Sequence, residues 1–183
     1  MLGLKSATDP EWTKTALSNE GALLHDHAHL ERKAAGNALT LVGQLPDHAP
    51  EILEVVHEEL EHFERVCGLL EKRNLPLGPD TGNPYVKQLT EVGGRRRLLD
   101  RLLKMGLVEA RSFERFSLLA AAASGDLTEL YRDLQESEAG HHVLFVKLAY
   151  SKFPRDVVQK RWDELATAEA EIVANTPWGP RIH

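Results

Sequence analysis

Helix-breaking residues fall in only a few clusters of this sequence, and the stretches between them are rich in Ala, Leu, Glu, Arg and Lys. These residues favour helices, and runs of β-branched residues are scarce. The pattern predicts four long helices and a short helix near each terminus. The expected long helices are 19–42, 51–72, 86–123 (with a break near Gly93-Gly94) and 126–150. The short ones begin near Pro10 and Pro154.

The longest irregular stretch separates the second long helix from the third. It runs from Asn74 to Pro84 and contains three prolines and two glycines. In a four-helix bundle, such a crossover joins two neighbouring helices that run parallel. A length of 183 residues is typical of one domain. The sequence therefore predicts an all-α four-helix bundle with a long crossover and short additional terminal helices, formed by residues 1–183 as a single domain.

Composition excludes several classes of protein. The single cysteine, Cys67, rules out an intramolecular disulfide framework and a cysteine-rich zinc or iron–sulfur site. No run of about 18 apolar residues is present to span a bilayer, and the first residues lack the apolar segment of a secretory signal. The expected location is therefore the cytoplasm. The net charge of −6 argues against a general nucleic-acid-binding protein.

Glutamates interrupt the apolar faces of the predicted helices. Because an α-helix turns about 100° per residue, the direction of each side chain can be calculated. Glu31, Glu59 and Glu138 each lie in the middle of an apolar face. The second and third of these are followed, three residues later, by a histidine that lies about 60° to one side. These histidines are His62 and His141.

Buried carboxylates need a partner, because an unpaired one costs several kcal/mol or becomes neutral. A metal centre is the simplest shared partner. One Glu from each of two helices, with Glu-x-x-His from each of the other two, is the arrangement of di-iron and di-manganese carboxylate proteins. Carboxylate and imidazole ligands suit iron or manganese. Periodicity does not decide which glutamate of helix 86–123 is a ligand, because Glu109 and Glu114 flank its apolar face on opposite sides.

The other histidines divide into two groups. His27 and His142 face the apolar sides of their helices and are expected to hydrogen-bond to metal ligands or to be polar core residues. The remaining five are expected at the surface: His25, His29, His48, His57 and His183. In an alternative without metal, His62 and His141 are core histidines that hydrogen-bond to the buried glutamates.

Four segments of the chain resemble one known family. They read HAHLERKAAG at 27–36, EELEHF at 58–63, EARSFERF at 109–116 and EAGHH at 138–142. Together they resemble the tRNA 2-methylthio-N6-isopentenyladenosine hydroxylases, the MiaE family, from about Leu24 to Ala149. The resemblance implies a ferritin-like fold with a non-haem di-iron centre. It also implies that dioxygen is used to hydroxylate the isopentenyl group on adenosine 37 of tRNA.

The resemblance also implies a set of metal ligands, by motif position. The implied ligands are Glu31, Glu59, His62, Glu109, Glu138 and His141. Glu59 and Glu138 are expected to bridge or chelate the metals, and each histidine is expected to bind one of them. Glu109 is preferred to Glu114, which would then lie beside the ligands. The metals are expected to be two iron ions, with manganese as an alternative.

The implied reaction needs two electrons from outside the chain. The sequence has no flavin or nicotinamide fingerprint, so the expected donor is a reductase or a ferredoxin-like protein. One residue departs from the family pattern: Gly140 stands just before His141, where a bulkier residue is expected. The glycine would either widen the pocket or weaken the helix.

A basic stretch in this acidic chain suggests contacts with RNA. Residues 95–116 contain seven Lys or Arg and three Asp or Glu. Four of the basic residues lie within roughly 40° of one another on the predicted outward face: Arg97, Lys104, Arg111 and Arg115. They are candidates for binding phosphates of a tRNA anticodon loop. The alternative, weighted equally, is a solvated face whose cations pair with acidic neighbours or support the ligand carboxylates.

The leading interpretation is therefore a di-iron, dioxygen-dependent tRNA hydroxylase. A di-iron oxygenase acting on a small molecule is the first alternative. A ferritin-like iron-storage or peroxidase protein is the second. A metal-free helical interaction module is the third, and it requires that replacing Glu59 or Glu138 with alanine leave function unaffected.

Overall fold

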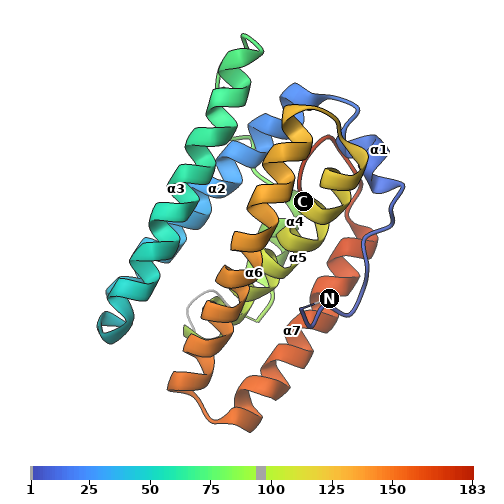
Figure 1. Cartoon of the computed structure of the whole chain (residues 1–183). Coiled ribbons are helices and arrows are strands. Elements are labelled where there is room, and N and C mark those ends of the chain that lie inside the picture. The colour runs from blue at the N-terminus through green and yellow to red at the C-terminus, as the bar shows by residue number, and fades with distance from the viewer. Residues whose placement is uncertain (1, 94–97) are drawn as a thin grey trace. The chain divides into compact units, whose positions relative to one another are not determined.

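The structure of the protein, a computed structural model, describes residues 2–93 and 98–183. In these two ranges every regular element is a helix, and there is no strand, which confirms the all-α prediction. The elements are α1 (Trp12–Ala16), α2 (Glu20–Val42), the 3-10 turn η1 (Pro46–His48), α3 (Ala49–Lys72), α4 (Pro84–Glu91), α5 (Leu98–Ala122), α6 (Asp126–Lys152) and α7 (Arg155–Asn175) (Figure 1).

The chain divides into two compact units. The α2–α3 unit comprises Lys14–Gly82 and Trp178–Ile182. The α5–α6 unit comprises the residues up to Thr13, Asn83–Pro177 and His183. The single domain expected from chain length stays a prediction.

The α2–α3 unit is built on a hairpin of two long helices. α2 begins after Asn19, whose side-chain oxygen accepts a hydrogen bond from the Ala22 N–H at 3.0 Å. Pro50 stands in the first turn of α3. Backbone N–H groups there have no acceptor within the helix, so the proline costs no hydrogen bond. Apolar side chains of both helices are buried, among them Leu24, Ala28, Ala35, Ala38, Ile52, Val55, Val66 and Leu70. Both predicted helices agree with the observed ones within two residues.

The crossover that follows α3 is attached to α2. Asp80 forms ion pairs with Arg32 at 3.1 Å and with Lys33 at 2.8 Å. His29 donates a ring N–H to the carbonyl oxygen of Gly78 at 2.9 Å. His29 is therefore buried, and the expectation that it lies at the surface is wrong. The crossover is an ordered connection held by charge and hydrogen bonds.

In the α5–α6 unit, the predicted helix 86–123 is two helices. α4 ends at Glu91 and α5 begins at Leu98. Gly93, between them, has a φ of +70°. This left-handed conformation favours glycine, and a Cβ at this position would also displace the guanidinium of Arg161, whose Nη2 would lie 1.8 Å away. Gly94, the other glycine of the predicted break, lies outside the described residues.

A substitution in α6 tests whether Gly140 makes room for a neighbouring group or weakens the helix. This glycine is exposed in the helix, and among the described residues a Cβ there would meet no atom within 4 Å. It therefore makes no room for a neighbouring group, and its expected effect is to weaken α6. Gly140→Ala is expected to raise the free energy of unfolding by about 0.5–1 kcal/mol in urea titrations.

The matched control is Gly125→Ala at the start of the same helix. Gly125 has a φ of +61°, which an L-residue rarely adopts, so alanine there is expected to destabilise the protein. Equal effects of the two substitutions would contradict this interpretation of Gly140.

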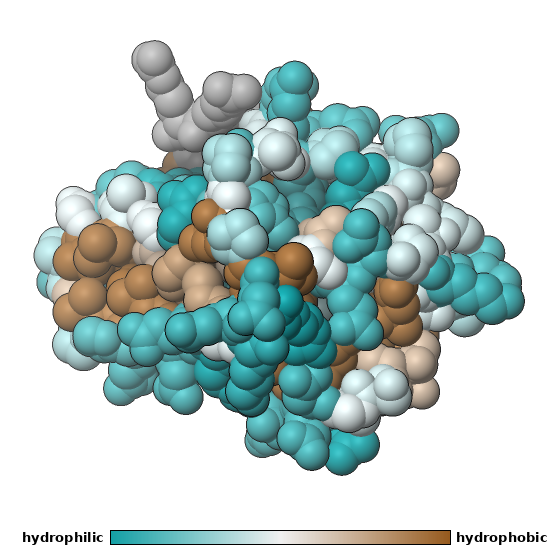
Figure 2. Space-filling model, turned by 90° about the horizontal axis from the view of Figure 1, so that it is seen from above, coloured by the Kyte–Doolittle hydropathy of each residue, from teal (hydrophilic) through white to brown (hydrophobic). Residues whose placement is uncertain are grey.

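Apolar residues also reach the surface, interspersed with hydrophilic ones (Figure 2). The most exposed large ones include Leu39, Val143 and Trp178. Single exposed apolar side chains are common in folded proteins and need no special explanation. None of the described helices combines the length and the hydropathy that crossing a membrane requires.

Candidate metal centre

The α2–α3 unit brings three predicted ligands together. Glu31 on α2 and Glu59 and His62 on α3 each offer a ligand atom within 4.8 Å of the others. The Nδ1 atom of His62 lies 3.7 Å from Oε2 of Glu31 and 3.9 Å from Oε2 of Glu59. All three side chains are buried. Because Glu59 and His62 are three residues apart, they share the inner face of α3 with Ile52 and Val66. We call these three residues the α2–α3 cluster.

A fourth residue orients Glu31. His27, one turn earlier on α2, donates its Nε2–H to Oε1 of Glu31 at 2.5 Å. Burial acts to raise the pKa of Glu31, but the nearby His27 and hydrogen bonds from His27 and His62 hold that pKa well below its ordinary value. Glu31 is therefore ionised, as a metal ligand must be. Its other oxygen, Oε2, is directed toward the cluster.

The α5–α6 unit contains a second cluster of the same composition. Glu109 on α5 and Glu138 and His141 on α6 each offer a ligand atom within 4.8 Å of the others. These side chains are also buried. We call them the α5–α6 cluster. Each cluster thus holds two carboxylates and one imidazole, with a Glu-x-x-His pair on one helix and a single Glu on its neighbour.

The donor sets fit a divalent metal ion. Two buried carboxylates in one place repel each other and lose hydration, so each cluster needs a compensating positive charge. A divalent cation supplies that charge. Carboxylate oxygen and neutral imidazole nitrogen are ligands that iron and manganese accept. The residues present in each cluster therefore match what one such ion requires.

The chain from residue 2 to residue 183 matches the family described as tRNA-(MS2IO6A)-hydroxylase (MiaE). The chain belongs to the MiaE family. A Pseudomonas putida protein named tRNA 2-(methylsulfanyl)-N(6)-isopentenyladenosine(37) hydroxylase is 31% identical over 182 residues, covering 96% of this chain and 89% of that protein. A Salmonella typhimurium protein of the same name is 30% identical over 132 residues, covering 70% of this chain and 48% of that protein.

A solved structure supports the same fold. It is described as protein 43 with aldehyde deformylating oxygenase activity, from Synechococcus. It is 36% identical, with a TM-score of 0.89, and the match covers 98% of this chain and 94% of the other. The prediction of a ferritin-like helical fold is confirmed. The MiaE family is a family of hydroxylases, so the prediction of an enzyme is confirmed as well.

In this member of the MiaE family, Glu114 and His142 contact other groups. The two carboxylate oxygens of Glu114 accept hydrogen bonds from N–H and Oγ1 of Thr8, at 2.8 and 2.7 Å. His142 donates its Nδ1–H to the carbonyl oxygen of Gly106 at 2.8 Å, and burial lowers its pKa. The structure thus places Glu109, and not Glu114, in the α5–α6 cluster.

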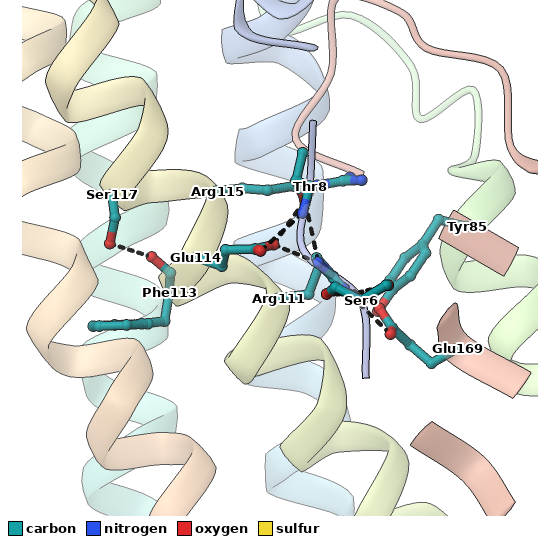
Figure 3. A network of polar contacts seen from close by, with 9 residues as sticks. All are labelled: Ser6, Thr8, Tyr85, Arg111, Phe113, Glu114, Arg115, Ser117 and Glu169. Carbon is teal, nitrogen blue, oxygen red and sulfur yellow. Dashed lines mark hydrogen bonds and ion pairs between the residues drawn. The ribbon is translucent and has the colours of Figure 1, made fainter. Parts of the chain in front are cut away.

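Three of the four basic residues predicted on an outward face of α5 are buried: Lys104, Arg111 and Arg115. Figure 3 shows the last two of them within a network of polar contacts. Arg111 is fully buried and forms a two-point ion pair with Glu169 of α7, at 2.8 and 2.9 Å. It also contacts Glu114 and donates to the carbonyl oxygen of Ser6 at 3.1 Å. Burial alone would lower the pKa of Arg111, but Glu169 and Glu114 raise that pKa above its ordinary value. Arg111 therefore joins α5, α7 and the N-terminal segment that contains Ser6 and Thr8.

The other members of the predicted basic stripe are similarly unavailable to solvent. Lys104 is buried and donates to the carbonyl oxygen of Thr90 at 3.0 Å. Arg115 is buried with its guanidinium 4.9 Å from the ring centre of Trp12, and burial lowers its pKa to about 10. The prediction of an outward basic face is wrong for these residues, because the N-terminal segment, α4 and α7 cover this side of α5. Arg97 lies outside the described residues.

The buried polar residues of this unit that were not anticipated from the sequence include Glu169 and His183. Glu169 lies on the apolar face of α7 between Leu165 and Ile172, a spacing that could have revealed it. His183 was expected at the surface, but it is buried, with its ring stacked on Tyr85 at 4.8 Å. No local pattern marks a C-terminal residue for burial.

Proposed function

We propose that this chain is a di-iron, dioxygen-dependent monooxygenase that hydroxylates the isopentenyl side chain of 2-methylthio-N6-isopentenyladenosine at position 37 of tRNA. The observation that carries the proposal is the pair of buried clusters in a chain that matches the MiaE family from residue 2 to residue 183. The two relatives named as hydroxylases of this nucleoside supply the substrate. The reaction would take place in the cytoplasm, on the anticodon loop.

The proposed ligands are the six residues of the two clusters. The α2–α3 cluster would hold one iron and the α5–α6 cluster the other, within a single domain. Glu59 and Glu138 would bridge or chelate, and Glu31 and Glu109 would be terminal ligands. Support comes from the matching composition of the clusters and from charge, because four carboxylates balance two ferrous ions. Manganese would satisfy the same donor set.

A pair of iron ions, when bound, would supply the oxidising power to cleave an unactivated C–H bond with dioxygen. The protein's part is to hold, orient and shield. His27 fixes one oxygen of Glu31 and leaves the other for the metal. Apolar side chains near the ligands in sequence, such as Leu24, Ala28 and Phe145, are fully buried and would keep water away from the site. The two electrons would come from an external reductase or ferredoxin-like protein.

Product analysis tests the proposal directly. The protein is loaded with ferrous iron under argon and supplied with a reductant, labelled dioxygen and an anticodon stem-loop that carries the isopentenyl nucleoside. The nucleoside is expected to gain one labelled oxygen atom, as measured by mass spectrometry. A stem-loop with unmodified adenosine is the control. No oxygen transfer with an iron-loaded protein would overturn the proposal.

A second candidate is an oxygenase that acts on an aldehyde. It is favoured by the 36% identity to the Synechococcus protein, which is described with that activity. The same iron-loaded protein is incubated with a fatty aldehyde in place of the RNA. Loss of the formyl carbon from the aldehyde, without modification of the stem-loop, would favour this candidate.

The role of His27 gives a separate prediction. His27→Ala removes the hydrogen bond that orients Glu31, so the affinity of the α2–α3 cluster for ferrous iron is expected to fall about 10–100-fold. Competition with a chelator measures this affinity. The matched control is His142→Ala, which removes another buried histidine that bonds to the Gly106 carbonyl. Equal affinities in the His27 variant and the unchanged protein would contradict the assigned role.

A further inference from the structure

The turn between α6 and α7 carries a concentration of positive charge that the proposed chemistry does not use. Residues 147–160 contain four basic residues and one acidic residue, in a chain of net charge −6. The basic side chains are Lys147, Lys152, Arg155 and Lys160, and all four residues are exposed. The turn lies at the lower edge of Figure 1.

An aromatic ring lies within this basic region. The guanidinium of Arg155 sits 5.5 Å from the ring centre of Tyr150. The Tyr150 hydroxyl donates to Oε1 of Gln159 at 3.3 Å, which fixes the ring against the start of α7. An arginine over a half-exposed tyrosine makes a flat surface of the kind on which unpaired RNA bases stack. We call Lys147, Tyr150, Lys152 and Arg155 the α6–α7 surface.

Charge changes sign along α6. The first turns expose Glu129, Asp133 and Glu136, whereas the last turns expose Lys147 and Lys152. The helix dipole favours acidic residues at a helix start and basic ones at its end. It does not account for Arg155, which stands in the first turn of α7, where the dipole disfavours a cation. The helix dipole therefore accounts for the lysines at the end of α6 but not for Arg155.

The surface is also close to a proposed metal ligand on the same helix. Lys147 and Lys152 follow His141 by six and eleven residues. At 1.5 Å per residue these distances along α6 are about 9 and 16 Å. The two lysines therefore lie about two and three turns of α6 from His141.

We propose that the α6–α7 surface binds the phosphate backbone of the RNA substrate, with Arg155 and Tyr150 stacking against an unpaired base. This inference rests on the proposed function and replaces the stripe of buried cations on α5 as the source of electrostatic attraction. Anionic phosphates are drawn to the basic end of α6 and repelled from its acidic end. The charge gradient thus sets the direction in which the loop lies along the helix.

The test compares two triple variants that each remove three exposed basic residues. The first is Lys147→Ala, Lys152→Ala and Arg155→Ala. The control is Lys72→Ala, Lys87→Ala and Arg132→Ala, which lie on α3, α4 and the acidic half of α6. Affinity for a labelled anticodon stem-loop is measured by fluorescence anisotropy at several salt concentrations. Thermal unfolding of both variants checks that each is folded.

The first variant is expected to raise Kd about tenfold or more and to reduce the slope of log K against log salt by about two to three. The control is expected to stay within about twofold of the unchanged protein. Tyr150→Leu is expected to weaken binding roughly five- to hundredfold through lost stacking, with the salt slope unchanged.

The outcomes separate this inference from the proposed function. If the unchanged protein hydroxylates the stem-loop and the first variant binds it equally well, the α6–α7 surface does not bind the RNA. The proposed function then stands. If the unchanged protein neither binds nor modifies RNA, the proposed function fails and the inference fails with it. If the first variant binds RNA normally but is reduced more slowly by an acidic electron-transfer protein, the surface docks that protein and the RNA assignment is overturned.

Discussion

Replacing Glu138 with alanine is expected to remove bound iron and to lower kcat/KM for the modified RNA at least about a thousandfold, or roughly 4 kcal/mol of transition-state stabilisation. Glu138 is buried and lies with Glu109 and His141 in the α5–α6 cluster. Alanine offers no ligand atom in its place. It also leaves the remaining carboxylate and imidazole with too few donors to hold the ion.

Metal content and stability together check this prediction. Iron is counted by mass spectrometry after anaerobic reloading, and the control is Glu136→Ala, an exposed glutamate on the same helix. The iron-free variant is expected to unfold at a higher temperature than the iron-free parent, because a buried charge has been removed. Full iron content in the Glu138 variant would refute the ligand assignment. Unchanged function in the same variant would favour the metal-free helical module.

Replacing Arg111 with alanine is expected to destabilise the protein by about 3–5 kcal/mol, because it leaves the buried carboxylate of Glu169 without its two-point partner. Both side chains of this pair are fully buried. In a chain of this length the loss corresponds to a fall in Tm of roughly 6–20 °C. Differential scanning calorimetry on the iron-free protein measures it without a contribution from the metal.

Two further variants identify the cause of the loss. Arg111→Met combined with Glu169→Leu removes both charges and is expected to recover part of the lost stability. Lys5→Ala breaks an exposed ion pair with Asp163 and is expected to change stability by at most about 1 kcal/mol. A small effect of Arg111→Ala alone would mean that water or another group compensates Glu169.

Most of the predicted helix bounds and inward-facing residues came from helical periodicity and from the positions of helix-breaking residues. The helices of the α2–α3 unit were predicted within two residues because their breakers, such as Gly43 and Pro76, are local. Periodicity also placed Glu59 on an inner face, and the structure buries it there. The choice between Glu109 and Glu114 was beyond this method, since both flank the same face. Thr8, about a hundred residues earlier, decides it by engaging both oxygens of Glu114.

The main error was the prediction that the basic residues of α5 face the solvent, and it arose because distant segments of the chain pack over them. Lys104, Arg111 and Arg115 do share one side of α5, as the periodicity indicated. Whether that side is exposed depends on which distant segments lie on it, and a helical wheel holds no such information. The N-terminal segment and α7 lie on it and convert a basic stripe into an internal network (Figure 3).

The composition of the α5–α6 unit has a consequence for the order of folding during synthesis. Ser6 and Thr8 leave the ribosome first, whereas Glu169, which completes their network around Arg111, is made more than 150 residues later. At 5–20 residues per second, the N-terminal segment waits about ten to thirty seconds for its partners. The hairpin of α2 and α3 joins two helices that are neighbours in sequence, so we expect it to assemble during that interval. Its contact with Ile182, which donates its N–H to Asp26 at 2.9 Å, forms only when the C-terminal residues are made. We therefore expect the α2–α3 hairpin to form early and the contacts of the two chain ends to form last.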